Sequence, residues 1–273
     1  MGAGRVTGNP WLLCFQGILW REFLRFLHQR GRFFAALVRP LVWLFIFAAG
    51  FRSVLGVSYQ PPYVTYILYE VYITPGLCGM ILLFSGMQSS LSMVYDREMG
   101  SMRVLLVSPM PRWWLLSCKL VAAVLVACFQ AYVFLAIAWF WDVRPPALGY
   151  LTVFPALMLA GLMLGALGLL LSSVIRQLEN FAGVMNFVIF PMFFASSALY
   201  PLWRMKESSI LLYQISSANP FSHAVELIRF ALYHQLDLTS LLLTVMWTGL
   251  FLAGALYGYN PARGFVALTG KGE

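Results

Sequence analysis

Six windows of the chain run for about 20 residues or more with almost no charged side chain, which is the length a helix needs to cross the hydrocarbon core of a bilayer. Lipid offers no hydrogen-bond partners, so a crossing segment must satisfy its own backbone polar groups, as an α-helix does. The windows are 33–51, 71–94, 113–141, 147–175, 180–203 and 238–257. The sequence therefore predicts an all-α polytopic membrane protein with six transmembrane helices, in one domain over residues 1–273.

The composition agrees with a membrane location. Hydrophobic residues make up 61% of the chain and charged residues 10%, whereas a soluble domain carries about 25% charged residues. The net charge of +8 could indicate a nucleic-acid partner. However, no basic run is interleaved with aromatic side chains, and the cytoplasmic loops of membrane proteins retain Lys and Arg. We therefore expect membrane lipid, and no nucleic acid, among the partners.

The distribution of Lys and Arg predicts the orientation. Six spans place both termini on the same side of the membrane. If that side is the cytoplasm, the cytoplasmic flanks hold most of the basic residues, and the outer flanks hold Arg52, Arg144, Arg204, Lys206 and Arg229. The positive-inside rule then predicts cytoplasmic N- and C-termini.

Residues 11–32, before the first window, have the pattern of an amphipathic helix. Arg21, Glu22 and Arg25 share one face, and apolar and aromatic side chains share the other. A helix of this kind lies in the membrane interface with its charged face toward water. The alternative is a cytoplasmic extension of the first span, but Gly31 favours a break and hence a separate interfacial helix.

A charged stretch interrupts the apolar pattern between the second and third windows. Gly100 can end the second span in a left-handed cap, and Ser101 can cap a new short helix. Pro109 ends that helix, because proline lacks an N–H donor and restricts the residue before it. The predicted cytoplasmic helix, about 100–109, carries apolar side chains such as Leu105 among charges, which indicates a protein partner.

The region between the fifth and sixth windows, about 204–237, is too long for a turn and too charged to cross the bilayer. Asn219 followed by Pro220 predicts a helix start, with Asn as N-cap and Pro at the first helical position. Glu226 and Arg229 share one face of that helix. Non-spanning helices at membrane depth must be buried in protein or line a wet cavity. We therefore expect a re-entrant helical hairpin entering from the outside.

Four elements together resemble the ABC-2-type transporter permeases, the membrane subunits of ABC exporters for polysaccharides, lipid-linked glycans and drugs. They are the amphipathic N-terminal helix, YITPGL (72–77), YDREMGSMRVLLVSPMPRWWLLSCKL (95–120) and ANPFSHAVELIRFALY (218–233). The elements follow in the family's order and sample nearly the whole chain. The charged stretch is the most specific of them.

The resemblance implies a coupling helix at about 100–109 that docks into a separate ATP-binding subunit. It also implies two copies of that ATPase, which bind ATP and Mg, and a second copy of this chain or a close paralogue. The expected location is the bacterial inner membrane. The candidate coupling residues are Asp96, Arg97, Glu98, Gly100, Ser101, Arg103, Leu105, Leu106 and Pro109.

The chain carries no sequence sign of catalysis. It contains no G-x-x-x-x-G-K-[ST] motif, so it cannot bind ATP through a P-loop. His28, His223 and His234 lack the spacing of metal ligands, so we expect no metal site. We therefore expect a transport subunit that is not itself an enzyme, binds no cofactor and depends on a partner for ATP hydrolysis.

The alternative is an ion-gradient-driven secondary transporter or channel. Such proteins usually show ionisable groups at mid-membrane and internal repeats. The two halves of this chain show no repeat, and Arg39 is the exceptional charge inside a span. Its position near the start of the span favours a side chain that extends to the headgroups or pairs at a subunit surface.

Polar and aromatic side chains within two spans are candidates for a substrate pathway. Ser85, Gln88 and Ser89 lie in the second window, and Asn186 and Phe190 in the fifth. The small polar residues could equally hold helices together. The aromatic and Met content of the spans favours an amphipathic, lipid-like, glycan or drug-like substrate.

Overall fold

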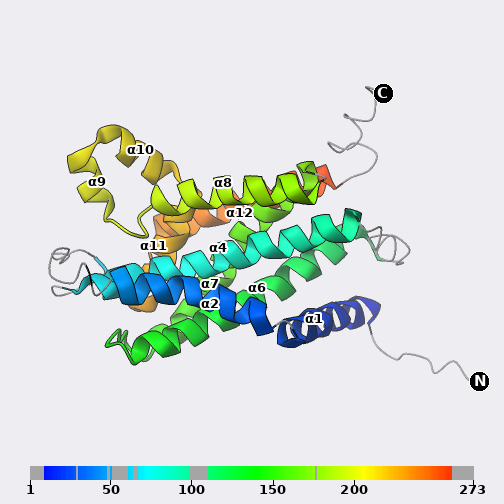
Figure 1. The fold of residues 1–273 in the computed structure, drawn as a ribbon, viewed down its shortest axis with the longest axis horizontal. Coiled ribbons are helices and arrows are strands. Elements are labelled where there is room, and N and C mark those ends of the chain that lie inside the picture. Colours follow the sequence, from blue (N-terminus) through cyan, green and yellow to red (C-terminus); the bar gives the residue numbers. More distant parts are fainter. Residues whose placement is uncertain are drawn as a thin grey trace, which may run out of the picture.

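The computed structural model describes residues 9–28, 30–47, 50, 61–63, 67–98, 110–175 and 177–259, and the regular elements in those ranges are helices. In chain order they are α1 (Pro10–His28), α2 (Arg30–Val42), η1 (Trp43–Phe47, a π-helical turn), α4 (Tyr69–Glu98), α6 (Arg112–Trp139), α7 (Gly149–Val174), α8 (Leu178–Phe194), α9 (Leu202–Ser208), α10 (Ile210–Ala218), α11 (Pro220–Leu232) and α12 (Leu238–Gly258). The long helices run along the long axis of the molecule (Figure 1). We call the end of this bundle where α4 begins the Tyr69 end, and the end where α4 finishes the Asp96 end. The predicted helix at 100–109 lies outside the described residues.

Four helices in the described ranges are long and apolar enough to cross a membrane. They are α4, α6, α7 and α12, with 30, 28, 26 and 21 residues. These helices occupy the second, third, fourth and sixth predicted windows. The first and fifth windows contain shorter apolar helices, Ala36–Ile46 and Leu178–Phe194. The described part of the chain is therefore helical, with four helices that meet the length criterion for a membrane span, as expected for a polytopic membrane protein.

The helix α8 ends inside the fifth predicted window because the chain turns back there. Pro191 lies in its last turn, and the N–H of Ala195 donates to the Pro191 carbonyl oxygen (2.9 Å). The side-chain amide of Asn219 donates to the carbonyl oxygens of Met192 and Ala195, at 2.8 and 2.6 Å. It thereby satisfies backbone acceptors that the end of a helix leaves open. A hydropathy window cannot detect this long-range contact, so the window 180–203 extends beyond the end of α8 at Phe194.

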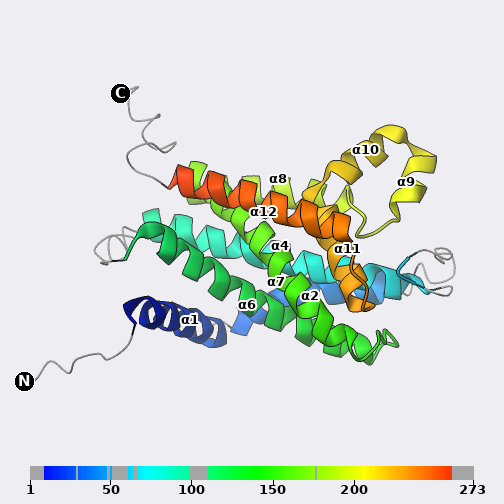
Figure 2. The same ribbon diagram turned by 180° about the vertical axis from the view of Figure 1, so that it is seen from behind.

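The structure has three helices where the sequence predicts a two-armed hairpin over 204–237. α9 and α10 pack on each other at the Tyr69 end, apart from the bundle (Figure 1). α11 instead packs against α4, α7 and α12 (Figure 2). Its residues Phe221, Val225 and Ile228 are fully buried. The amphipathic pattern of this segment thus reflects burial of one helix within the bundle.

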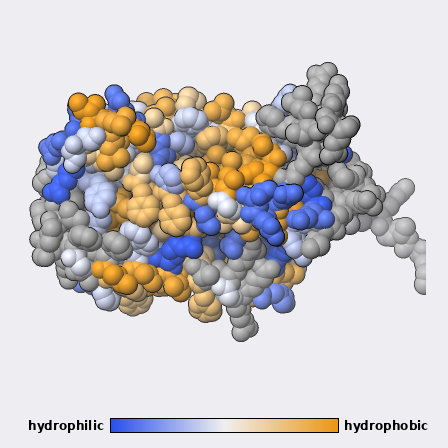
Figure 3. Space-filling model, turned by 45° about the horizontal axis from the view of Figure 1, so that its top comes forward, coloured by the Kyte–Doolittle hydropathy of each residue, from blue (hydrophilic) through white to orange (hydrophobic). Residues whose placement is uncertain are grey.

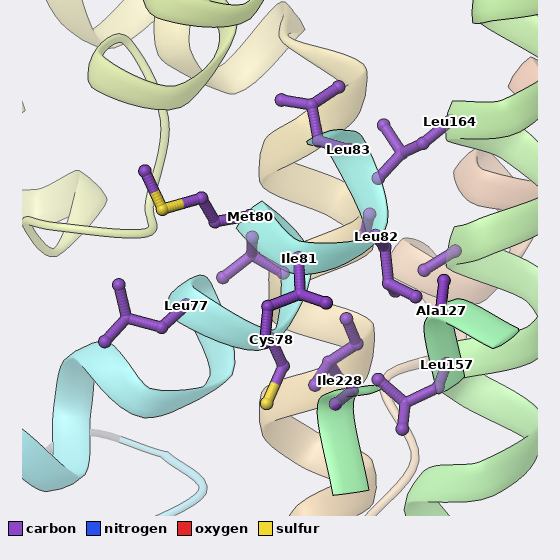
Figure 4. Close-up of a cluster of buried hydrophobic side chains, with 14 of the residues drawn as sticks. Leu77, Cys78, Met80, Ile81, Leu82, Leu83, Ala127, Leu157, Leu164 and Ile228 are labelled. Carbon is purple, nitrogen blue, oxygen red and sulfur yellow. The ribbon is translucent and has the colours of Figure 1, made fainter. Parts of the chain in front are cut away.

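The helix α4 is at the centre of the bundle and contacts α2, α6, α7, α8 and α11. Figure 4 shows Ile81 of α4 in the same buried cluster as Leu157 of α7 and Ile228 of α11. The backbones of α4 and α7 approach closely at two glycines: a Cβ added to Gly86 would lie 3.0 Å from the Cα of Gly165. Small residues at a contact allow helices in membranes to pack in this way.

The helix α1 lies beside α6 at the Asp96 end, outside the core (Figure 2). None of its residues is buried. Aromatic pairs hold it there: the ring centres of Trp11 and Trp114 are 5.2 Å apart, and those of Phe26 and Phe129 are 6.1 Å apart. Apolar side chains also form broad patches on the bundle surface (Figure 3), as expected for contact with lipid.

Candidate functional site

The last turn of α4 carries three consecutive charged residues, Asp96, Arg97 and Glu98. Successive residues of an α-helix point about 100° apart around its axis. These three side chains therefore reach different neighbours at the Asp96 end. We call this set of contacts the α4 junction; it directly precedes the segment predicted to couple to a partner.

Asp96 connects α4 to α6 and α1. The Nζ atom of Lys119 lies 3.3 Å from Asp96 Oδ2, and Arg25 Nη2 lies 4.0 Å from Asp96 Oδ1. Lys119 is buried, with 5% of its side chain exposed. A buried ammonium group requires a charged partner, because removal from water is costly. Asp96 therefore stabilises the position of α6 through Lys119.

Arg97 and Glu98 connect α4 to three other elements. Arg97 Nη2 donates to the carbonyl oxygen of Ser172 in α7 (2.7 Å), and its guanidinium lies 5.3 Å from the ring centre of Tyr259, just after α12. Glu98 Oε2 accepts from the backbone N–H of Leu178 at the start of α8 (3.3 Å). A carboxylate in this position also interacts favourably with the helix dipole. A displacement of the end of α4 would thus reach α6, α7, α8 and the end of α12.

The charged face of α1 contacts protein as well as water. Glu22 Oε1 lies 3.2 Å from Arg21 Nη2 and 4.0 Å from Arg25 Nη1. Arg21 is more than half exposed, whereas Arg25 turns toward Asp96. The sequence predicts this face to be solvated, and its contact with the α4 junction arises because α1 packs along α6.

The structure places Ser85, Gln88 and Ser89 beside the charged face of α1. They line a cavity of about 70 Å³ together with Glu22 and Arg25. Two groups of residues that the sequence assigns to separate roles therefore meet in one place. Gln130 of α6 completes this cavity and is a residue that the sequence analysis missed; a lone glutamine in an uncharged window was the available signal.

Asn186 and Phe190 do not line this cavity. Both are exposed on the outer face of α8, beside Phe187, which is 80% exposed. On α2, which packs against α4, the guanidinium of Arg39 lies 3.8 Å from the ring centre of Phe84 in α4. Within one chain, the pathway candidates of α4 and α8 thus belong to different surfaces.

At the Tyr69 end, Asn219 caps two helices at once. Its Oδ1 accepts from the backbone N–H of Phe221 (2.9 Å), which caps α11, with Pro220 as the first residue of that helix. Its Nδ2 donates to the end of α8 as described above. The Asn–Pro pair predicts the first of these roles, and only the tertiary structure reveals the second.

Arg229 of α11 is fully buried and forms an ion pair with Glu226 of the same helix. Its Nη2 donates to the carbonyl oxygen of Ser197 (2.8 Å), and its guanidinium lies 4.1 Å from the ring centre of Tyr72. Burial lowers the pKa of Arg229, but the Glu226 carboxylate more than offsets this effect, so the pKa lies above its ordinary value. The guanidinium is therefore charged and joins α11 to α4 and to the turn after α8.

Comparisons with known proteins agree with this architecture. Residues 14–233 match the family model described as ABC-2 type transporter. The chain is 32% identical over 186 residues to the probable multidrug ABC transporter permease YbhR of Escherichia coli (strain K12), which covers 67% of this chain and 48% of that protein. It is 25% identical over 220 residues to the putative transport permease ycf38 of Cyanophora paradoxa, with 79% of this chain and 72% of that protein covered. This chain thus spans about half the length of the Escherichia coli relative.

Proposed function

Because this chain belongs to the ABC-2 type transporter family, and is therefore a membrane transport permease, we propose that it is the membrane subunit of an ATP-driven exporter. The exporter moves an amphipathic substrate, lipid-like, glycan or drug-like, out of the cytoplasm or the inner leaflet. A drug-like substrate is in keeping with the printed name of the Escherichia coli relative.

The α4 junction is the observation that carries this proposal. Three consecutive side chains tie the end of α4 to Lys119, Ser172 and the start of α8. Because residues 100–109 follow directly, a push on that segment by a partner reaches most of the bundle through short polar contacts. This arrangement suits a subunit that is driven from one end.

Two ATPase subunits, which bind ATP and Mg, are the proposed partners. Each docks onto a coupling helix formed by residues 100–109, next to α1, on the cytoplasmic side of a bacterial inner membrane. In this orientation the termini are cytoplasmic, and the shorter helices Ala36–Ile46 and Leu178–Phe194 complete six spans. The helices α9 and α10, which pack apart from the bundle, cover the outer exit.

A second copy of the chain, or a close paralogue, completes the pathway. The exposed face of α8 supports this step, because Asn186 lies there among apolar side chains. An amide is costly to expose to lipid, and interhelical hydrogen bonds are its usual partners in membranes. We propose that the α8 faces of two copies meet, which places Asn186 and Phe190 at the pathway.

The test is purification of the full chain from its native membrane, with assay of co-purified ATPase activity. We expect a stoichiometric P-loop protein, lost when residues 100–109 are replaced by a Gly/Ser linker. The matched control replaces residues 142–148, a connection at the other end of the bundle, with a linker of equal design and retains the ATPase. A chain that purifies alone and supports ion-gradient-driven flux without ATP would overturn the proposal in favour of a secondary transporter.

A further inference from the structure

A long apolar groove runs between α1 and α6 and ends at the polar cavity described above. The groove has a volume of about 590 Å³, within the roughly 300–1,000 Å³ range of ligand-binding clefts. Its walls include Leu19, Trp20 and Phe23 of α1 and Leu125 and Phe129 of α6. Trp20 is 63% exposed, so the groove is open along one side. Its volume and apolar lining suit a hydrocarbon chain.

The groove and the polar cavity are continuous. Phe26 of α1 and Val126 of α6 line both of them. The cavity has a volume of about 70 Å³, enough for a small polar group but not for a bulky one. Together the two spaces form a site with one apolar part and one polar part. An amphiphilic ligand has the same two parts.

Gln130 indicates what chemical group would fit the polar cavity. Its side chain is 95% buried, and its Oε1 atom has no hydrogen-bond partner. A buried acceptor without a donor is unfavourable, so such groups are normally satisfied. A ligand that suits this cavity therefore donates an N–H or O–H to Gln130 Oε1.

The charged residues of α1 specify the rest of the polar group. Arg25 and Glu22 both line the cavity, so it presents a guanidinium and a carboxylate side by side. A ligand that carries a phosphate and a protonated amine satisfies both, because the phosphate accepts from Arg25 and the ammonium donates to Glu22 and Gln130. A quaternary amine has no N–H to donate.

We propose that this site binds one aminophospholipid of the phosphatidylethanolamine type. One acyl chain lies in the groove between α1 and α6, and the headgroup occupies the cavity. The second acyl chain leaves through the open side of the groove. The bound lipid connects α1 to α4 and α6, and this role is independent of the proposed coupling to ATP.

Native mass spectrometry of the purified full chain tests this proposal with four lipids of identical acyl chains. They are phosphatidylethanolamine, its N-methyl and N,N-dimethyl derivatives, and phosphatidylcholine. We expect retention to fall with each lost N–H, and phosphatidylcholine to bind about tenfold more weakly than phosphatidylethanolamine. Equal retention of the first and last lipid would overturn the proposal, and this comparison needs no variant.

Two variants with matched controls locate the site. Gln130→Leu should reduce the preference for phosphatidylethanolamine, because Glu22 remains as the second acceptor, and should leave phosphatidylcholine binding unchanged. Gln214→Leu, on the exposed side of α10, should keep the full preference. Val126→Trp fills the groove and should abolish retention of both lipids, whereas Val245→Trp, on the exposed face of α12, should not. Equal lipid retention by the two tryptophan variants would show that the lipid binds elsewhere. Because the chain is tested alone and without ATP, failure of the proposed export function would leave this result in place.

Discussion

Arg229 and Tyr72 donate to the same acceptor, the carbonyl oxygen of Ser197, at 2.8 and 2.9 Å. Their side chains also stack, with 4.1 Å between the guanidinium and the ring centre. One residue comes from α11 and the other from α4, and the acceptor lies in the turn after α8. A single backbone oxygen therefore joins three parts of the chain at the Tyr69 end.

Replacement of Arg229 by methionine should destabilise the fold strongly. The variant leaves Glu226 without its ion-pair partner and removes one donor from Ser197, and loss of one member of a buried pair costs about 3–5 kcal/mol. Unfolding in detergent, followed by circular dichroism, measures the difference. Arg144→Met is the control, because Arg144 pairs with Asp142 at an exposed site. Equal free energies of unfolding for the two variants would contradict this assignment.

Gly76 and Gly249 should respond in opposite directions to substitution by alanine. A Cβ on Gly76 would lie 2.7 Å from the Cβ and 2.8 Å from the Cα of Ala198, too close for the backbone to accept. We expect destabilisation by about 1–3 kcal/mol. A Cβ on Gly249 meets nothing within 4 Å, so the better helix propensity of alanine should stabilise by about 0.5 kcal/mol. The same unfolding assay applies, and a neutral Gly76→Ala variant would exclude the close contact.

Local sequence patterns predict the features that depend on neighbouring residues. The Asn219–Pro220 pair marks the start of α11 because a cap and a fixed φ are local properties. Gly165, in a G-x-x-x-G spacing with Gly161, lies where α7 approaches Gly86 of α4 closely, and such small-residue spacing is typical of tight helix packing in membranes. Long apolar windows likewise locate four full-length helices.

Local sequence patterns do not predict tertiary contacts between residues that are distant in the chain. Arg229 reads as a basic residue of an outer flank, yet it is fully buried, because Tyr72 and Ser197 supply partners from far away in the chain. Lys119, the charged residue inside the third window, is buried against Asp96, and nothing in the sequence around it indicates that partner. No period or motif encodes such pairs, so the α4 junction and the end of α8 emerge only from the packed structure.

The α4 junction predicts that two neighbouring carboxylates stabilise different helices. Asp96→Asn removes the charged partner of buried Lys119 and the contact to Arg25, so amide exchange in α1 should accelerate about tenfold. Glu98→Gln weakens the contact to Leu178 and should accelerate exchange at the start of α8 while leaving α1 unchanged. Hydrogen–deuterium exchange with mass spectrometry distinguishes the two patterns. Identical exchange maps for the two variants would refute separate roles.

The proposed pairing of two copies predicts a cross-link between identical positions on α8. In an isologous interface a residue near the two-fold axis meets its own copy, and a disulfide forms when the Cα atoms lie within about 7 Å. Asn186→Cys or Phe190→Cys, in a chain whose native cysteines Cys14, Cys78, Cys118 and Cys128 are replaced, should therefore give a dimer on mild oxidation in membranes. Leu242→Cys is the control, because Leu242 is 60% exposed on a different helix, α12. A dimer band at Leu242 but not at either α8 position would place the contact between copies on α12, and Asn186 would then need a partner other than a second α8.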